Sequence, residues 1–524
     1  MRPIDTPQFV SRSAFRFFSG TFLSKVTGML RDMAMAFYFG TSPALAAFLL
    51  TFRFVYLARR LFGESLLHQG FIPHFEEKRA ENSRRAAVFF RDLFWSMVVF
   101  LLGLVFLGEI VLSIFNGEVV RLASLMLPAV FFICLFGFCT GLLQSERSFF
   151  VPSVAPALSN IVWISGVFLL KALPLSRAAE GLAITLSIAF FLQWTMTIPK
   201  MWAFLKQHLS VKEIFKVSLF SSEIRTLVRP LMLGMIGVAS VQINSALDGI
   251  FGHFASSEGP AYLWYAIRIQ QLPLALFGIA LSSALLPSLS RAHKQGNRKH
   301  YFSLLTFARK RAFALIFPCM IGIFVLGLSS INLLFGRGDF SSVATMQTTL
   351  CLWSYGLGLL SMVLVQIYAP AFYAKKDYRT PMLGFVCSTI LNILLNALFV
   401  FYFKMGAFSI ALATSIASTA NLFYLYQKLE KPKESWSSSR RVAIPTLLVG
   451  GIVMAFGHWG LGDLSLMLGS KDILFPRQLT EQALHFFSQT GLYFALFFLL
   501  CKLFQAEDIL NLYSSKVAQR KSIS

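Results

Sequence analysis

The sequence carries little charge, and little of that charge is negative. Only 14% of its 524 residues are charged, and 24 acidic residues stand against 47 lysines and arginines. Hydrophobic residues make up 56% of the chain. Soluble domains carry about 25% charged residues, so this composition excludes an ordinary soluble domain and places the chain among polytopic membrane proteins.

Signatures of enzymes and metal sites are also missing. The chain has no HExxH, Walker A or GxSxG motif. Its six cysteines fall in apolar segments without a CxxC pair, so we expect small apolar side chains rather than disulfides or metal ligands. No polar stretch is longer than a loop, which excludes a membrane enzyme with a large outer catalytic loop. We therefore predict no enzyme activity and no cofactor.

Apolar windows of about 20 residues, the length that crosses a bilayer as a helix, recur along the whole chain. The predicted fold class is an all-α polytopic membrane protein with about fourteen transmembrane helices. The N-terminus shows no clean cleavable signal peptide, so we expect the first span to be retained. The windows are roughly 15–40, 44–68, 88–115, 121–144, 151–171, 179–204, 225–254, 261–286, 309–335, 347–373, 381–403, 406–427, 441–459 and 482–503.

Basic residues are distributed unevenly between the loops. If the N-terminus is cytoplasmic, the inward loops hold most of them, whereas the outward loops GTSPAL and NGEVVR hold few. This positive-inside pattern, with an even number of spans, predicts that both termini are cytoplasmic. It makes nucleic-acid binding the weaker interpretation of the net charge of +23. The inward basic residues are Lys78, Arg79, Arg84, Arg85, Lys206, Lys212, Lys216, Arg291, Lys294, Arg298, Lys299, Lys375, Lys376, Arg379, Lys428, Lys431 and Lys433.

Two pairs of segments suggest an internal repeat. Pro73 and Pro287 each stand at the end of a span, before a charged linker. Pro152 and Pro381 each follow a charged turn and open a span. Such repeats, with a site between the halves, are typical of secondary transporters. The predicted domains are an N-terminal lobe of six helices at 1–205, a second six-helix lobe at 206–430, and a C-terminal helix pair with a cytoplasmic tail at 431–524.

Four arginines lie where hydrocarbon is expected. Three of them, Arg53, Arg59 and Arg60, share one apolar stretch, and Arg268 lies in another with no acid within four residues. A charge at the bilayer centre costs at least a few kcal/mol and is usually kept only inside a bundle or a watery cavity. Arginine suits a phosphate because its planar fork donates two parallel hydrogen bonds. We therefore predict a cavity that binds an anion, in a transporter.

Two of the basic segments also contain acids. Arg31 is adjacent to Asp32, and Lys25 lies six residues earlier. These groups either line the cavity or form a local ion pair at a span end. Arg60 and Glu64 are four residues apart, so they can pair on one helix face. That pair is interpreted either as part of a moving gate or as a static salt bridge inside a bundle.

The sequence resembles the MurJ/MviN lipid II flippase family of the multidrug/oligosaccharidyl-lipid/polysaccharide exporter superfamily. Five segments in the family's order carry the resemblance, and together they span essentially the whole chain. They are SKVTGMLRDMAMAFYFG at 24–40, ARRLFGESLLHQGFIP at 58–73, RIQQLPLALFGIALSSALLPSLSR at 268–291, LFGRGDF at 334–340 and AFYAKKDYRTP at 371–381.

The resemblance implies a V-shaped fold of fourteen helices, with two six-helix lobes around a cationic cavity and two C-terminal helices. The substrate would be lipid II, an undecaprenyl diphosphate that carries a disaccharide-pentapeptide. The cavity would hold the diphosphate and sugar, and a groove at the last two helices would take the lipid tail. The implied substrate-binding residues are Lys25, Arg31, Arg53, Arg59, Arg60 and Arg268, and the implied gating or ion-pair residues are Ser24, Asp32 and Glu64.

Four positions depart from the family pattern. Lys25 stands where the family usually has arginine, and Arg53 where lysine is common. Ala46 occupies a position that is often acidic early in the second helix, and Gln271 stands where some members have glutamate. Gate contacts that depend on those two acids are therefore not predicted for this chain.

The resemblance implies alternating-access transport of lipid II from the cytoplasmic to the periplasmic leaflet of the bacterial inner membrane, for cell wall synthesis. The membrane potential favours outward movement of an anionic headgroup, by about 2.3 kcal/mol per charge per 100 mV for a full crossing. Expected partners are lipid II, membrane lipids and cell-wall synthesis machinery; the coupling ion is left open. The alternatives are a flippase for another polyprenyl-diphosphate glycan, a drug or cation antiporter, which the scarcity of in-span acids disfavours, and a non-transporting scaffold for cell-wall machinery.

Overall fold

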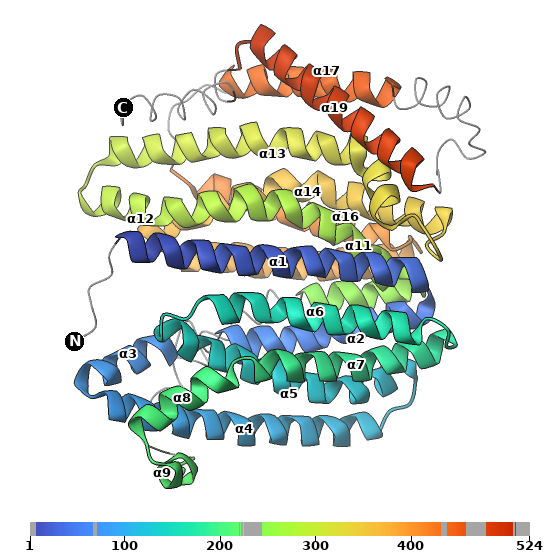
Figure 1. Ribbon diagram of the computed structural model, residues 1–524. Coiled ribbons are helices and arrows are strands. Elements are labelled where there is room, and N and C mark those ends of the chain that lie inside the picture. The colour runs from blue at the N-terminus through green and yellow to red at the C-terminus, as the bar shows by residue number, and fades with distance from the viewer. Residues whose placement is uncertain are drawn as a thin grey trace. The chain divides into compact units, whose positions relative to one another are not determined.

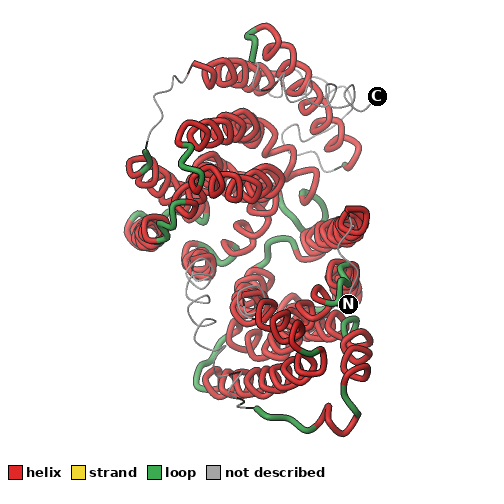
Figure 2. Tube along the Cα trace, turned by 90° about the vertical axis from the view of Figure 1, so that its left-hand side faces the viewer, coloured by secondary structure: helices red, strands yellow, loops and turns green. Residues whose placement is uncertain are grey.

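The computed structural model describes residues 7–65, 71–219, 221, 224, 244–430, 437–456, 478–506 and 509, without the side chains of 7–18, 64–65, 73, 279–280, 283–284 and 437–438. Within these ranges the regular structure is entirely helical, and neither view shows a strand (Figures 1 and 2). The all-helical class that the composition predicted is confirmed.

The chain divides into two compact units, Met1–Ile250 and Phe251–Ser524. The three-part division expected from the sequence, with boundaries at 205 and 430, stays a prediction. The first unit contains α1 (Pro7–Phe39), α2 (Pro43–Ala58), the π-helix η1 (Arg59–Ser65), α3 (Ile72–Glu81), α4 (Ser83–Ser113), α5 (Glu118–Ser145), α6 (Phe150–Leu170), α7 (Leu175–Thr195), α8 (Ile198–His208) and α9 (Val211–Phe215).

The second unit is also helical, and its last two described helices are α17 and α19. Residues 244–255, at the division between the units, are also helical. The elements that follow are α11 (Gly259–Pro273), the π-helix η3 (Leu274–Ile279), α12 (Ala280–Lys294), α13 (Arg298–Phe335), α14 (Ser342–Ala374), α15 (Arg379–Ala397), the π-helix η4 (Leu398–Tyr402), α16 (Phe408–Lys428), α17 (Ser437–Ala455) and α19 (Leu479–Leu503).

Nine helical segments in the described part of the chain are long and apolar enough to cross a membrane. They coincide with nine of the fourteen windows expected from the sequence. The window at 225–254 lies largely outside the described residues. The second window falls short because α2 has only 16 residues before the backbone widens into η1. These segments are Ser83–Ser113, Glu118–Ser145, Phe150–Leu170, Leu175–His208, Arg298–Phe335, Ser342–Ala374, Arg379–Tyr402, Phe408–Lys428 and Leu479–Leu503.

The internal repeat suggested by the sequence is visible in the backbone. Arg147 and Lys376 both adopt the left-handed conformation, with φ of 58° and 62°. Each lies five positions before a proline, Pro152 or Pro381, near the start of the next helix. The helix pairs correspond as well: α2 packs on α5, α5 on α7 and α6 on α7, while α11 packs on α14, α14 on α16 and α15 on α16. Both units thus use one packing scheme.

The core of the first unit is aromatic next to the predicted site. Trp163 on α6 is fully buried, and the rings of Phe48 and Phe52 from α2 meet it edge to face at 5.5 and 5.1 Å. Helix α1 packs along α6 on the same side of the unit (Figure 1). Because aromatic side chains contribute large buried areas, this cluster holds α2 against α6, which also packs on α1. Helices α1 and α2 carry three of the six predicted basic residues, Lys25, Arg31 and Arg53.

The final helices α17 and α19 cross one another and pack on α13 (Figure 1). Val449 of α17 and Phe497 of α19 belong to one buried cluster with Ala314 of α13. The hydroxyl of Tyr493 donates a hydrogen bond to the Pro318 carbonyl at 2.8 Å. Pro318 lies inside α13, where a proline ring displaces the normal helical hydrogen bond. The carbonyl that the proline leaves unbonded is that of Ala314, four residues earlier, so the Tyr493 bond is an additional contact that holds α19 against α13.

Candidate functional site

The predicted site residues are divided between the two units. Ser24, Lys25, Arg31 and Asp32 lie on α1, Arg53 lies on α2, and Arg59, Arg60 and Glu64 lie in η1. Arg268 lies on α11 of the second unit. The side chain of Glu64 is outside the described part of the structure, so its predicted pair with Arg60 stays a prediction.

Arg31 contacts three side chains, those of Asp32, Asn160 and Trp163. Its Nε and Nη2 donate to Oδ1 of Asp32 at 3.0 and 2.7 Å, and Nη1 donates to Oδ1 of Asn160 at 3.0 Å. The guanidinium also lies over the ring of Trp163, 4.5 Å from its centroid. Arg31 is 9% exposed and Asp32 is 2% exposed. The ion pair that the sequence left as one alternative is therefore present in this structure.

Asn160 extends this network back along α1. Its Nδ2 donates to the carbonyl of Ser24 at 3.1 Å and to Oγ1 of Thr27 at 3.2 Å. Ser24 takes part in this network through its backbone carbonyl, and its implied gating role stays a prediction. Lys25 is exposed on the neighbouring face of α1, and no ion pair links it to another described residue. Lys25 and Arg31 are six residues apart, a spacing that puts them on different faces of an α-helix, and their different exposure agrees with this.

Arg53 makes a contact that the sequence did not anticipate. Its Nη1 donates to the carbonyl of Ser245 at 3.0 Å, on the helical segment 244–255. That segment approaches closely at Gly249, where an added Cβ would stand 2.8 Å from Cδ of Arg53. A glycine is needed here to make room for the arginine stem. Arg53 therefore connects α2 with the helix that leads toward the second unit in sequence.

Arg59 and Arg60 open the π-helix η1, where the sequence suggested continuous α-helix. Arg59 is half-buried, with its guanidinium 5.1 Å from the centroid of the Tyr56 ring, whereas Arg60 is exposed. The wide turn passes close to α5, since a Cβ on Gly137 would stand 2.9 Å from Cα of Gly63. π-Helical turns change which residues share a face and often mark functional sites. Arg53 and Arg60 are seven residues apart, about two turns of an α-helix, but Arg60 lies in the π-helix, so α-helical spacing alone does not decide whether the two share a face.

Arg268 repeats the arginine–tryptophan arrangement in the second unit. Its guanidinium lies 4.0 Å from the centroid of the Trp264 ring, one helical turn earlier on α11. Gln270 is buried and its Nε2 lies 3.1 Å from Sδ of Met362, whereas Gln271 is exposed. As in the first unit, a π-helix follows the basic helix, here η3 after Pro273. A cation against an indole face gains about 0.5–2 kcal/mol, more when water is excluded.

The sequence interpretation missed three residues that shape the site: Asn160, Trp163 and Trp264. Trp264 lies four positions before Arg268, the spacing that places two side chains on one α-helical face, so this pair was readable. Asn160 and Trp163 are more than 120 residues from Arg31, and no local pattern links them to it. Their role follows only from the packing of α6 against α1.

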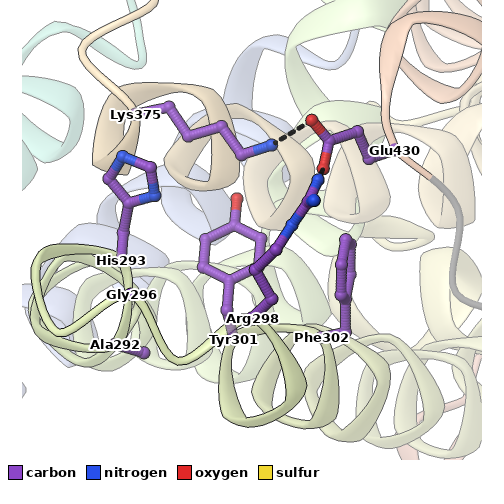
Figure 3. Close-up of a pocket in the computed structure, with 8 residues that line it drawn as sticks. All are labelled: Ala292, His293, Gly296, Arg298, Tyr301, Phe302, Lys375 and Glu430. Atoms are coloured by element: carbon purple, nitrogen blue, oxygen red, sulfur yellow. Dashed lines mark hydrogen bonds and ion pairs between the residues drawn. The ribbon is translucent and has the colours of Figure 1, made fainter.

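A second polar cluster lies at the ends of α12, α14 and α16 and at the start of α13, in a pocket of about 340 Å³ (Figure 3). Arg298 and Lys375 point to the two carboxylate oxygens of Glu430, at 2.8 and 3.1 Å. The Tyr301 hydroxyl donates to the Ala371 carbonyl at 2.6 Å. The hydrogen bond from Arg298, then that from Lys375, lowers the pKa of Glu430. This cluster ties the end of α16 to α13 and α14.

We predict a small pH-dependent stabilisation from this cluster. A lowered folded-state pKa means that the contribution is present above the ordinary glutamate pKa and is lost as the pH falls through the lowered value. The groups are mostly exposed, so at most about 1 kcal/mol is expected. Thermal unfolding of purified Glu430→Gln protein should show a deficit near neutral pH that shrinks as the pH falls below 4.5, the unperturbed value. Glu77→Gln, on exposed α3, is the control, and a deficit of Glu430→Gln that stays constant with pH would contradict the prediction.

Comparison with known sequences gives one consistent result. A family model described as "Lipid II flippase MurJ" matches residues 35–470. A relative named "Probable lipid II flippase MurJ" from Chlamydia muridarum is 32% identical, over 96% of this chain and 96% of its own length. A relative of the same name from Aquifex aeolicus is 30% identical, over 84% of this chain and 88% of its own length.

Solved structures agree at the level of the fold. A lipid II flippase MurJ in an inward closed conformation superposes with a TM-score of 0.75 at 23% identity, covering 94% of this chain and 99% of that one. An inward-facing multidrug resistance transporter of the MATE family gives 0.64 at 16% identity, covering 79% of this chain and 97% of its own.

Proposed function

We propose the function of this chain from its family membership. The chain belongs to the lipid II flippase MurJ family. The resemblance read from its five sequence segments is thereby confirmed, and so is the expectation of a transporter rather than an enzyme. It is a multi-pass membrane protein of a bacterial family. The match over nearly the whole length of a curated relative is the observation that carries the proposal.

The chain moves lipid II, the undecaprenyl-diphosphate-linked disaccharide-pentapeptide, from the cytoplasmic to the periplasmic leaflet by alternating access. It resides in the bacterial inner membrane with both termini in the cytoplasm. Fourteen transmembrane helices form two six-helix lobes in a V shape, followed by the C-terminal pair. The corresponding helix packing of the two units and the nine described spans support this architecture.

Six cations, five in the first unit and one in the second, are the proposed headgroup ligands. Lys25, Arg31, Arg53, Arg59, Arg60 and Arg268 bind the diphosphate and sugar, and Ser24, Asp32 and Glu64 serve gating or ion pairing. In this scheme Asp32 holds the guanidinium of Arg31 until the diphosphate takes its place. The contacts of Arg31 with the Trp163 ring and of Arg268 with the Trp264 ring support the scheme. An indole face holds a guanidinium in position while the N–H groups of the guanidinium point away from the ring.

Two of the buried acids disfavour the antiporter alternative. Cation exporters need membrane-embedded carboxylates for their substrate or coupling ion. Asp32 and Asp92 are both buried, and each is already paired with the preceding arginine, at 2.7 Å and 2.6 Å. A carboxylate that is neutralised in this way has little attraction left for a second cation. The likeness to the MATE structure is a likeness of fold alone.

The test is complementation in a bacterium whose own lipid II flippase can be depleted. We expect that supplying this chain restores growth and restores lipid II that an impermeant reagent can reach from outside. Another polyprenyl-linked substrate is distinguished by assaying that glycan lipid in the same cells. A correctly inserted, well-expressed chain that restores neither growth nor accessible lipid II would overturn the assignment of lipid II.

A further inference from the structure

Two adjoining hollows in the first unit are not used by the proposed headgroup site. The larger, of about 550 Å³, lies among α2, α4 and α5 and is within the size range of ligand pockets. Aliphatic side chains line it, together with Phe54. Among the described residues that line it, Thr51 alone has a hydroxyl, and that group donates to the Ala47 carbonyl at 2.8 Å. The larger hollow therefore offers no polar partner and suits a hydrocarbon chain.

The smaller hollow, of about 310 Å³, lies at the connection between α4 and α5. It shares the lining residues Leu112 and Val120 with the larger one, so the two lie next to each other. Its lining mixes apolar side chains with polar ones and carries both signs of charge, Glu109 and Arg121. The larger, apolar pocket (the slot) adjoins the smaller pocket (the mouth), which carries one acid and one base. This is the layout of a phospholipid-binding site. The position on α4 fits, since only 11% of its most apolar window is buried in the protein.

The two charged groups at the mouth keep capacity for a ligand. Glu109 accepts a hydrogen bond from the Ser124 hydroxyl through Oε2 at 2.6 Å, which fixes the carboxylate and leaves Oε1 to a second donor. Arg121 reaches Glu180 through Nη2 at 3.0 Å, and its side chain is 70% exposed. Guanidinium has five donors, so most of its N–H groups are available to a phosphate.

We propose that this site binds a zwitterionic phospholipid whose headgroup ends in a primary ammonium. One acyl chain occupies the slot, the phosphate meets Arg121, and the ammonium donates to Glu109. Charge complementarity selects this occupant. A purely anionic headgroup would meet the Glu109 carboxylate, and a trimethylated ammonium has no N–H to donate. Because Thr51 and Phe54 flank Arg53 on α2, the bound chain supports the helix that carries a proposed substrate-binding arginine.

Native mass spectrometry of the purified full-length chain tests the proposal, after exchange into lipids of matched acyl chains. Phosphatidylethanolamine should be retained as a single adduct in preference to phosphatidylcholine and phosphatidylglycerol. Glu109→Gln should weaken that adduct about tenfold, as expected for loss of a charged hydrogen-bond partner. It should also abolish the preference over phosphatidylcholine. Ala123→Phe, which fills the slot, should lower retention of all three lipids.

Matched controls change the same residue types outside both hollows. Glu118→Gln on α5 and Arg177→Gln on α7 should leave retention unchanged, whereas Arg121→Gln should reduce it. If Ala123→Phe does not fold, the two mouth variants still decide the question. Equal retention of the three lipids, or stronger retention of phosphatidylglycerol, would overturn the proposal. So would a Glu109→Gln protein with undiminished preference for phosphatidylethanolamine. The test is independent of lipid II transport.

Discussion

The Arg268→Glu variant is expected to insert normally and to leave almost no lipid II accessible at the outer surface. Arg268 is held over Trp264 at 4.0 Å in the second unit, and it is the predicted anion ligand there. Charge reversal replaces an attraction for diphosphate by a repulsion. Removing one partner of a buried charged hydrogen bond costs about 2–5 kcal/mol, so transport should fall about 30-fold or more. The depletion strain measures this through growth and through externally accessible lipid II.

Three companion variants separate the role of Arg268 from general damage. Lys404→Glu changes the net charge by the same amount on an exposed loop of the same unit and should transport normally. Arg268→Gln should lose transport without adding a repulsive charge. Arg268→Lys keeps the charge but loses the fork that binds two phosphate oxygens, so it should retain partial activity. Wild-type transport by Arg268→Glu, at equal membrane abundance, would remove Arg268 from the headgroup site.

Much of the fold could be predicted from the sequence because hydrocarbon imposes a local rule. A span needs about 20 apolar residues whatever it packs against, so hydrophobic windows alone locate it. The rule is weakest where charge interrupts the window. Helix α2 reaches only Ala58 before the π-helix begins at Arg59, and the close approach of Gly63 to Gly137 accompanies this change. A contact between distant segments cannot be read from either segment alone.

In the candidate site, too, local features could be predicted from the sequence and contacts between distant segments could not. Arginines inside apolar stretches are visible in the sequence because the cost of burying them is local. The partners that hold them are mostly not local: Asn160 and Trp163 meet Arg31 only after α6 has packed on α1, and Ser245 meets Arg53 across 192 residues. The Arg31–Asp32 pair was readable from adjacency. Whether the pair lines the cavity or is only a local ion pair can be decided by removing one or both of its charges.

We expect Asp32→Asn to be the most destabilising single change at the site. The carboxylate balances a guanidinium that is 9% exposed, and Asn160 and Trp163 do not replace the lost negative charge. Breaking a buried ion pair from one side costs about 3–5 kcal/mol, because the remaining charge stays buried. Thermal unfolding of the purified protein should show a large loss of stability. Glu118→Gln, at the exposed start of α5, is the control for removal of an acid.

The double variant Arg31→Gln/Asp32→Asn then decides what the pair is for. Removing both charges leaves a neutral pair that can still hydrogen bond, so stability should recover in large part relative to Asp32→Asn alone. If Arg31 binds the diphosphate once it leaves Asp32, the double variant is stable but transports poorly. If the pair only joins α1 to α6, stability and transport recover together. We expect the first result, because replacing one anion by another at a fixed guanidinium costs less than bringing an unpaired arginine into the membrane. Normal transport by a stable double variant would assign Arg31 a structural role and leave headgroup binding to the remaining cations.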